Sequence, residues 1–111
     1  MLEIDGSTIY LTKGDSAMIA VDITNSVTGQ NYAMQEGDKL YLTVRKMPYK
    51  ASAALVEKVV TGDTVFRLLP EDTAGLRSGT YQYDVELRSG QDVYTVVPCS
   101  EFVLTPEVTM T

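Results

Sequence analysis

The residues of this chain whose types could support catalysis are a lone cysteine and a pair of adjacent acids. Cys99 follows a proline in an apolar stretch without a basic neighbour to stabilise a thiolate, so we expect a structural role. Glu71 and Asp72 follow Pro70, a pattern typical of a first helical turn, where acids satisfy free N–H groups. The chain contains no histidine, the commonest general base and zinc ligand. We therefore predict no enzymatic activity, no catalytic residue and no cofactor.

Three Gly-Asp turns supply the candidates for a metal site. Asp15, Asp38 and Asp63 would bind calcium only if the fold brought them together at one end of the molecule. Neither an Asp-x-Asp loop nor a bidentate glutamate at the expected spacing accompanies them. We interpret the three as turn residues and predict no metal ion.

The aromatic residues suggest a binding role. The chain has seven tyrosines and no tryptophan. Tyr41, Tyr49 and Tyr94 are expected on outward faces, where tyrosine favours contacts with other proteins. Stacking on carbohydrate is the alternative, although β-sandwich modules that bind sugars depend on surface tryptophan. These three tyrosines are the candidate protein-contact residues.

The charge of the chain excludes two classes of partner. Nine basic and fifteen acidic residues give a net charge of −6 over 111 residues. Nucleic acids and anionic membranes are both held by clustered Lys and Arg, so we expect neither as a partner. The first five residues lack the basic and apolar regions of a secretory signal, and no apolar run approaches the ~20 residues of a membrane helix. We therefore expect synthesis in the cytoplasm.

The elements that would position these residues are strands. Between Gly79 and Arg88, apolar or aromatic residues alternate with polar ones, which lets an extended strand bury one face. Turn signals separate further strand-like segments, at 8–12, 17–24, 39–47, 55–60, 64–69, 93–97 and 101–105. The sequence predicts an all-β antiparallel sandwich of about seven or eight strands over residues 1–105, immunoglobulin-like in topology.

The segments between and after the strands refine this prediction. Pro48 is expected to end the strand that begins at Lys39, because proline cannot donate to a central ladder. Pro98 to Ser100 is expected to bend the chain between two strands. One short helical turn is predicted near 71–76, and residues 106–111 form a polar C-terminal tail.

Two tyrosines indicate the topology of the sandwich. In immunoglobulin-like domains, a tyrosine before a central strand bonds back to the backbone, two residues ahead of a core cysteine position. Tyr81 has this place after Leu76-Arg77-Ser78-Gly79-Thr80, and Tyr83 stands where the cysteine would be. We expect the ring of Tyr83 to fill the space between the sheets by packing.

Two segments carry apolar residues on both faces. Residues 55–60 and 93–97 are too apolar to be fully exposed to solvent on either side. Either they are central strands covered on both faces, or a partner, a second copy or an added strand covers them.

Several short motifs together resemble a known family. They are Leu11-Thr12-Lys13-Gly14-Asp15-Ser16, Gln35-Glu36-Gly37-Asp38-Lys39-Leu40, Leu69-Pro70-Glu71-Asp72-Thr73, Gly79-Thr80-Tyr81-Gln82-Tyr83-Asp84-Val85 and Asp92-Val93-Tyr94-Thr95-Val96. With these motifs the chain resembles small immunoglobulin-like proteins of phages and prophages of Gram-positive bacteria, and the N-terminal domain type of phage baseplate upper proteins. The resemblance implies a virion, tail or baseplate-associated structural protein. Its partners would be other phage structural proteins or copies of itself, and its final location the virion.

Two other functions remain as hypotheses. One is a carbohydrate- or cell-surface-binding module. The other is a small protein inhibitor that presents the loop at 25–31 or the loop at 47–54 to a protease.

Overall fold

The computed structural model describes residues 2–25, 27–47, 49 and 51–108. Pro48, parts of the loops 25–31 and 47–54, and the last three residues of the predicted tail lie outside this range. The described chain forms two sheets and one short helix, α1 (Pro70–Ala74), which confirms the predicted all-β sandwich. Among the described residues, no helix has the length and apolar character needed to cross a membrane.

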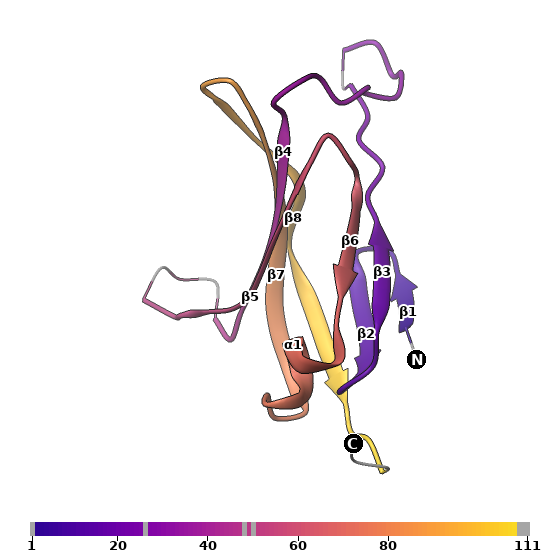
Figure 1. Cartoon of the computed structure of the whole chain (residues 1–111), viewed down its shortest axis with the longest axis vertical. Helices are drawn as coiled ribbons and strands as arrows, with labels where there is room; N and C mark the ends of the chain where they lie inside the picture. Colours follow the sequence, from indigo (N-terminus) through magenta and orange to yellow (C-terminus); the bar gives the residue numbers. More distant parts are fainter. Residues whose placement is uncertain (1, 26, 48, 50, 109–111) are drawn as a thin grey trace.

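The larger sheet has six strands in the order β1-β2-β8-β7-β4-β5. Their bounds are β1 (Leu2–Asp5), β2 (Thr8–Thr12), β8 (Asp92–Thr105), β7 (Gly79–Ser89), β4 (Lys39–Arg45) and β5 (Ala54–Thr61). The smaller sheet pairs β3 (Ala17–Ala20) with β6 (Val65–Leu68). The smaller sheet stands beside one face of the larger, and α1 lies at the same end as the marked C-terminus (Figure 1).

The strand order is that of an immunoglobulin-like sandwich. In variable-type domains, strands G, F, C and C′ form one sheet, and strands B and E lie in the other. Here β8-β7-β4-β5 and β3-β6 occupy those places. The hydroxyl of Tyr81 donates a hydrogen bond to the carbonyl of Arg77, 2.7 Å away, so the predicted corner is present.

One pairing differs from the antiparallel prediction. β2 and β8 are parallel neighbours, with Ile9 opposite Phe102 and Leu11 opposite Leu104. All other ladders are antiparallel. The alternation of side chains is the same in both kinds of ladder, so the sequence pattern could not separate them.

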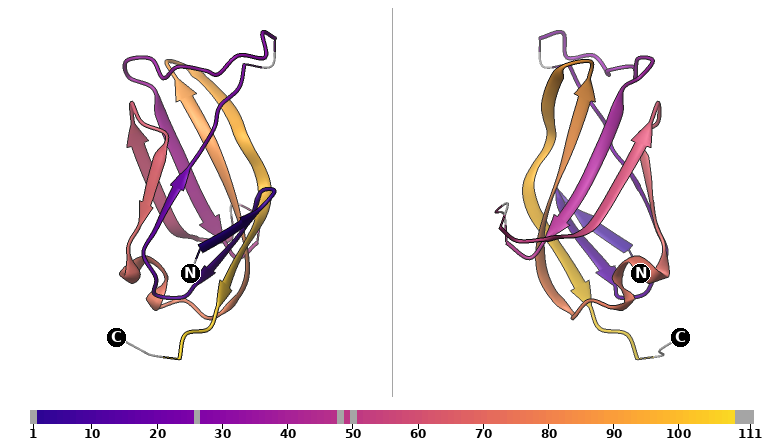
Figure 2. Two further views of the ribbon diagram at one scale, coloured as in Figure 1. Left: turned by 90° about the vertical axis from the view of Figure 1, so that its right-hand side faces the viewer. Right: turned by 60° about the vertical axis from the view of Figure 1, so that its left-hand side comes forward.

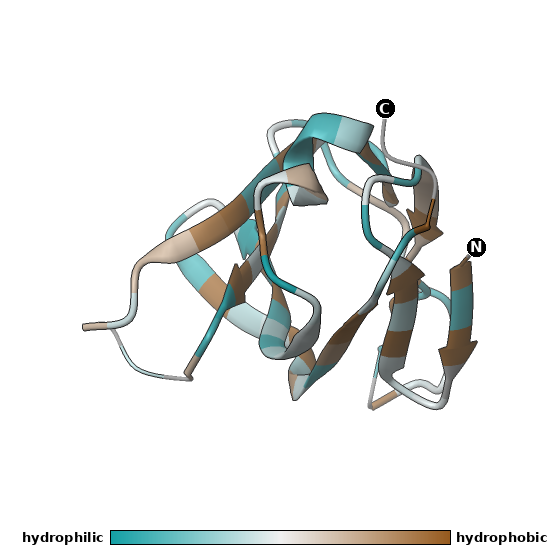
Figure 3. Ribbon diagram, turned by 90° about the horizontal axis from the view of Figure 1, so that it is seen from below, coloured by the Kyte–Doolittle hydropathy of each residue, from teal (hydrophilic) through white to brown (hydrophobic). Residues whose placement is uncertain are grey.

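The core lies between the two sheets and follows the period-two pattern. In β4 and β7 the buried positions alternate with half-exposed ones. Figure 3 shows hydrophobic and hydrophilic segments that alternate along the strands. Fully buried Phe66 comes from the smaller sheet and Phe102 from the larger. The ring of Tyr83 is 6% exposed and packs edge-on against Phe102, with 6.1 Å between ring centroids. The predicted core position of Tyr83 is therefore confirmed.

Besides shifts of one or two residues at strand ends, such as β4 ending at Arg45 and not at the predicted Met47, three features of the strands differ from the prediction. The ladder of β3 ends at Ala20, although burial continues to Val21 and half-burial to Ile23, because its partner β6 begins only at Val65. β1 was not predicted; it forms a hairpin with β2 through the two-residue turn at Gly6 and Ser7.

The third difference is that β8 is one continuous strand instead of two. Register shifts at Tyr83/Val85 and Val85/Glu86 place β-bulges near Cys99 and Val96. A bulge absorbs an extra residue without ending the strand, and it tolerates Pro98, which has no N–H to donate.

Candidate functional site

The residues that could support catalysis are held in structural roles or lie apart. Asp72 accepts a hydrogen bond from the N–H of Leu69 at 2.7 Å and forms an ion pair with Lys58 at 2.7 Å. Burial acts to raise the pKa of Asp72, but these two partners outweigh it and lower the pKa below its ordinary value. The predicted capping role is thus confirmed for Asp72. Cys99 is exposed on β8, and its Sγ lies 3.5 Å from Oε1 of Gln82.

The turn that contains Asp15 lies apart from the turns of Asp38 and Asp63, which are joined to each other. The turn before β3 lies against α1, because the N–H of Gly14 donates to the hydroxyl of Thr73 at 2.9 Å. The turn before β4 lies at the other end of β6, where the N–H of Gly62 donates to the carbonyl of Asp38. Among the described residues, no group of three or more His, Cys, Asp or Glu side chains is placed to hold a metal ion.

The candidate tyrosines lie on two different faces. Tyr41 is half-buried on the outer face of the larger sheet, with the guanidinium of Arg88 4.2 Å from its ring centroid. Tyr49 is 60% exposed and lines a pocket on the same face. Tyr94 pairs with the buried Leu87, so it points to the inner face, contrary to the expectation of an outward face. It is nevertheless 53% exposed, because it lies near the turn of the β7–β8 hairpin.

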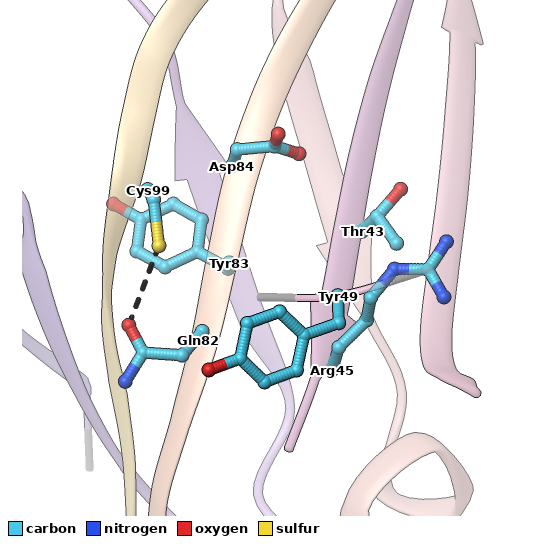
Figure 4. Close-up of a pocket in the computed structure, with 7 residues that line it drawn as sticks. All are labelled: Thr43, Arg45, Tyr49, Gln82, Tyr83, Asp84 and Cys99. Atoms are coloured by element: carbon cyan, nitrogen blue, oxygen red, sulfur yellow. Dashed lines mark hydrogen bonds between the residues drawn. The ribbon is translucent and has the colours of Figure 1, made fainter. Parts of the chain in front are cut away.

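The pocket on the outer face encloses about 220 Å³ between β4, β7 and β8. Figure 4 shows the ring of Tyr49 extending toward Gln82, while the guanidinium of Arg45 points away from it. Arg45 donates to the carbonyl of Ser52. Burial raises the pKa of the Asp84 carboxyl, and the charge of Glu86 raises it further. The pocket therefore combines an exposed aromatic ring with polar side chains.

A second, larger cavity lies at the end of the sandwich opposite α1. It measures about 710 Å³ and separates the segment 22–32 from β7 and β8. We call this cavity the seam slot. Apolar side chains line it from both sides, namely Ile23, Val27, Tyr32, Leu87, Tyr94 and Val96. In Figure 2 the chain leaving β3 crosses in front of the larger sheet toward this end of the molecule.

A hydrogen-bonded pair holds the base of the loop beside the seam slot. The hydroxyl of Tyr32 donates to Oδ2 of Asp38 at 2.5 Å, and the N–H of Gln35 donates to the same oxygen at 2.9 Å. Hydrogen bonds from Tyr32, Ser89 and Gln35 lower the pKa of the buried Asp38 carboxyl. The hydrogen bond to Asp38 raises the pKa of Tyr32. The sequence analysis assigned Asp38 to a turn and missed this partnership, which joins residues six positions apart.

The sequence alone identified Tyr94 and the apolar segment 93–97 but not the cavity beside them. The cavity depends on where the ladder of β3 stops, which the alternation of residues 17–24 conceals. The chain matches no protein-family model, no curated protein and no solved structure.

Proposed function

We propose that this protein is a non-enzymatic structural component of a phage or prophage particle, associated with the tail or baseplate, which acts through contacts with other proteins. The observation that carries the proposal is the concentration of exposed apolar side chains at one end of the sandwich. Val27 is 91% and Tyr94 53% exposed, and both line the seam slot. Val93, next to Tyr94 on the other face of β8, is 57% exposed. Exposed apolar clusters of this kind mark surfaces that a partner covers.

The motifs that resemble phage immunoglobulin-like proteins supply the context for these contacts. They include the strands that form the β7–β8 hairpin, which border the seam slot, and the turn before β4, whose Asp38 accepts a hydrogen bond from Tyr32 of the slot. A partner among phage structural proteins would bury the apolar end and leave the rest of the acidic surface in solvent.

Mass spectrometry of purified virions tests this proposal. Particles induced from the bacterium that carries the gene are expected to contain the protein in a fixed ratio to tail or baseplate proteins. The neighbouring genes are expected to encode tail or head proteins. The proposal would be contradicted if the gene for this protein lay among metabolic genes and the particles lacked the protein.

A specific observation favours a second candidate, a carbohydrate- or cell-surface-binding module. The exposed ring of Tyr49 extends toward Gln82 and shares its pocket with the carboxyl of Asp84, and such a combination can stack on a sugar ring and bond its hydroxyls. A glycan array that includes host cell-wall polymers tests it. Binding that Tyr49→Ala removes and Tyr94→Ala retains would support this candidate, and the absence of binding across the array would contradict it.

A further inference from the structure

The strand β8 has an open edge along its first half. β7 pairs with β8 on one side over its whole length, from Ser89↔Asp92 to Gly79↔Leu104. On the other side, β2 pairs with β8 only from Phe102 onward. Ser7 lies beside Ser100, with 2.9 Å between the two hydroxyl oxygens. Within the described part of the chain, residues 92–98 therefore have no neighbouring strand on that side, and we call them the open edge.

The turn of the β7–β8 hairpin determines which backbone groups face the open edge. Two residues, Gly90 and Gln91, connect Ser89 to Asp92, and Gly90 has a positive φ of 60°. Residues that flank such a two-residue turn form a hydrogen-bonded pair, and the pairs alternate along an antiparallel ladder. The N–H and C=O groups of Val93 and Thr95 are therefore directed away from β7, toward the open edge.

Side chains from this segment also line the adjacent cavity. Tyr94 and Val96 line the seam slot. A smaller cavity of about 140 Å³ shares Asp22 with the slot and is lined by Val85 and Val97. The bulge near Val96 lets both Val96 and Val97 pack against the core. An added strand about 4.8 Å from β8 would thus find apolar space for its inward-facing side chains.

Between Val93 and Thr95 the open edge lacks the features that normally prevent strand addition. Natural edge strands carry charges, proline or β-bulges, are very short or are covered. Asp92, the bulge near Val96 and Pro98 all lie outside this stretch. The segment from Val93 to Val97 contains no charged residue, whereas β5, at one border of the larger sheet, contains Glu57 and Lys58. β1, at the other border, has four residues. The open edge is therefore the edge of the larger sheet best suited to accept a strand.

The charges around the seam slot indicate what kind of strand would fit. Among the described residues, Asp22 is the one charged side chain that lines the slot, and the exposed Asp92 stands at the end of the open edge. The guanidinium of Arg88, which follows Leu87 of the slot in sequence, lies over Tyr41 on the outer face and 3.4 Å from Glu86. A second copy would bring another net charge of −6. A basic segment is therefore the better complement.

We propose that the open edge accepts an extended segment of a partner protein as an additional strand of the larger sheet. The segment bonds to the backbone of Val93 and Thr95 and places apolar side chains at alternate positions into the seam slot. It carries lysine or arginine near Asp22 and Asp92. This inference rests on the proposed function as a contact-making component, and it names the surface and the chemistry of the partner.

Synthetic peptides test the inference on the whole protein. The first probe is an octapeptide that alternates between residues facing the slot and residues facing outward, with valine at the central slot-facing positions, lysine at the outermost slot-facing positions and threonine at the outward positions. The matched probe has glutamate in place of lysine. We expect the lysine peptide to slow amide hydrogen exchange of Val93 and Thr95 and to bind about fivefold or more tightly than the glutamate peptide at low salt, as expected for about one favourable charge contact. No protection at roughly 1 mM lysine peptide, or equal binding of both peptides, would overturn the inference.

Two variants locate the binding. Thr95→Pro removes an N–H that faces the open edge without removing a bond to β7, so the fold is expected to survive and peptide binding to be lost. The matched control, Thr95→Val, keeps the N–H and is expected to bind normally. If Thr95→Pro fails to fold, Asp22→Lys serves instead, and it is expected to reverse the preference between the two peptides. An unchanged preference would contradict the proposed site.

One further outcome distinguishes a foreign partner from a second copy of this chain. Protection of Val93 and Thr95 that rises with protein concentration in the absence of peptide would show pairing between copies and overturn the choice of a foreign partner. Because these readouts do not depend on a virion, they fail or succeed separately from the mass spectrometry of phage particles.

Discussion

Tyr83 connects neighbouring segments of the larger sheet through both its ring and its hydroxyl. The ring packs edge-on against Phe102, and the hydroxyl donates to the carbonyl of Ser7. Burial raises the pKa of this hydroxyl, in agreement with a position away from solvent. At this position antibody domains have a disulfide-bonded cysteine, whereas Tyr83 stabilises the structure by packing.

Replacement of Tyr83 by alanine is expected to lower the free energy of unfolding by about 3–5 kcal/mol, because a large buried ring is lost and a cavity remains. Tyr83→Phe removes only the hydrogen bond to Ser7 and is expected to cost about 1 kcal/mol. Urea titrations of the three proteins measure both values. A loss below about 1 kcal/mol for the alanine variant would show that the ring is not part of the core.

Asp38 makes the stability of the protein dependent on pH, at the end of the sandwich that holds the seam slot. Its carboxylate accepts hydrogen bonds in the folded state, chiefly from Tyr32, so its folded pKa lies below the unfolded value. The ionised group therefore stabilises the fold at neutral pH, and this contribution is lost as pH falls through the lowered folded pKa. Asp38→Asn is expected to be less stable than the wild type at pH 7, and the difference should shrink between about pH 4 and pH 2.

Unfolding curves of the wild type, Asp38→Asn and Tyr32→Phe across this pH range provide the measurement. Tyr32→Phe removes the principal donor to Asp38. The stability of this variant is therefore also expected to change less with pH than that of the wild type. A constant difference between the wild type and Asp38→Asn from pH 7 to pH 2 would contradict the role assigned to the carboxylate.

At the scale of elements, α1 is fixed by its first turn. Asp72 bonds the N–H of Leu69 and pairs with Lys58 of β5, so one carboxylate ties the helix to the larger sheet. Asp72→Ala is expected to destabilise the protein by about 1 kcal/mol, the usual cost of a lost helix cap. Glu71→Ala, the adjacent acid, is the matched control and is expected to have little effect. If thermal unfolding showed equal losses of stability for the two variants, this assignment would be contradicted.

The elements differ in how far the sequence could predict them. β4 and β7 were predictable because one face is buried over their whole length, so apolar and polar residues alternate without interruption. The parallel contact of β2 with β8 was not, because it joins residues more than ninety positions apart and leaves no local pattern. The continuity of β8 was hidden by Pro98, which the bulge accommodates.

At the scale of the whole molecule, the candidate site arises from what the two sheets leave uncovered. The sequence indicated that residues 93–97 needed cover but left open whether the rest of the chain supplied it. In the structure β3 ends at Ala20 and β2 reaches β8 only at Phe102, so neither covers the first half of β8. The uncovered first half of β8 depends on the lengths of three separate strands, β2, β3 and β8. The alternation of apolar and polar residues alone does not specify these lengths.

Residue-resolved amide hydrogen exchange of the free protein tests the central claim that β8 has an open edge. The N–H of Tyr94 should be protected by its bond to β7, whereas the N–H groups of Val93 and Thr95 should exchange at least about tenfold faster. This alternation between adjacent residues is the result we expect. Equal, strong protection of all three amides would mean that another part of the molecule already covers the edge, and it would contradict both the strand-acceptor surface and the role proposed for it.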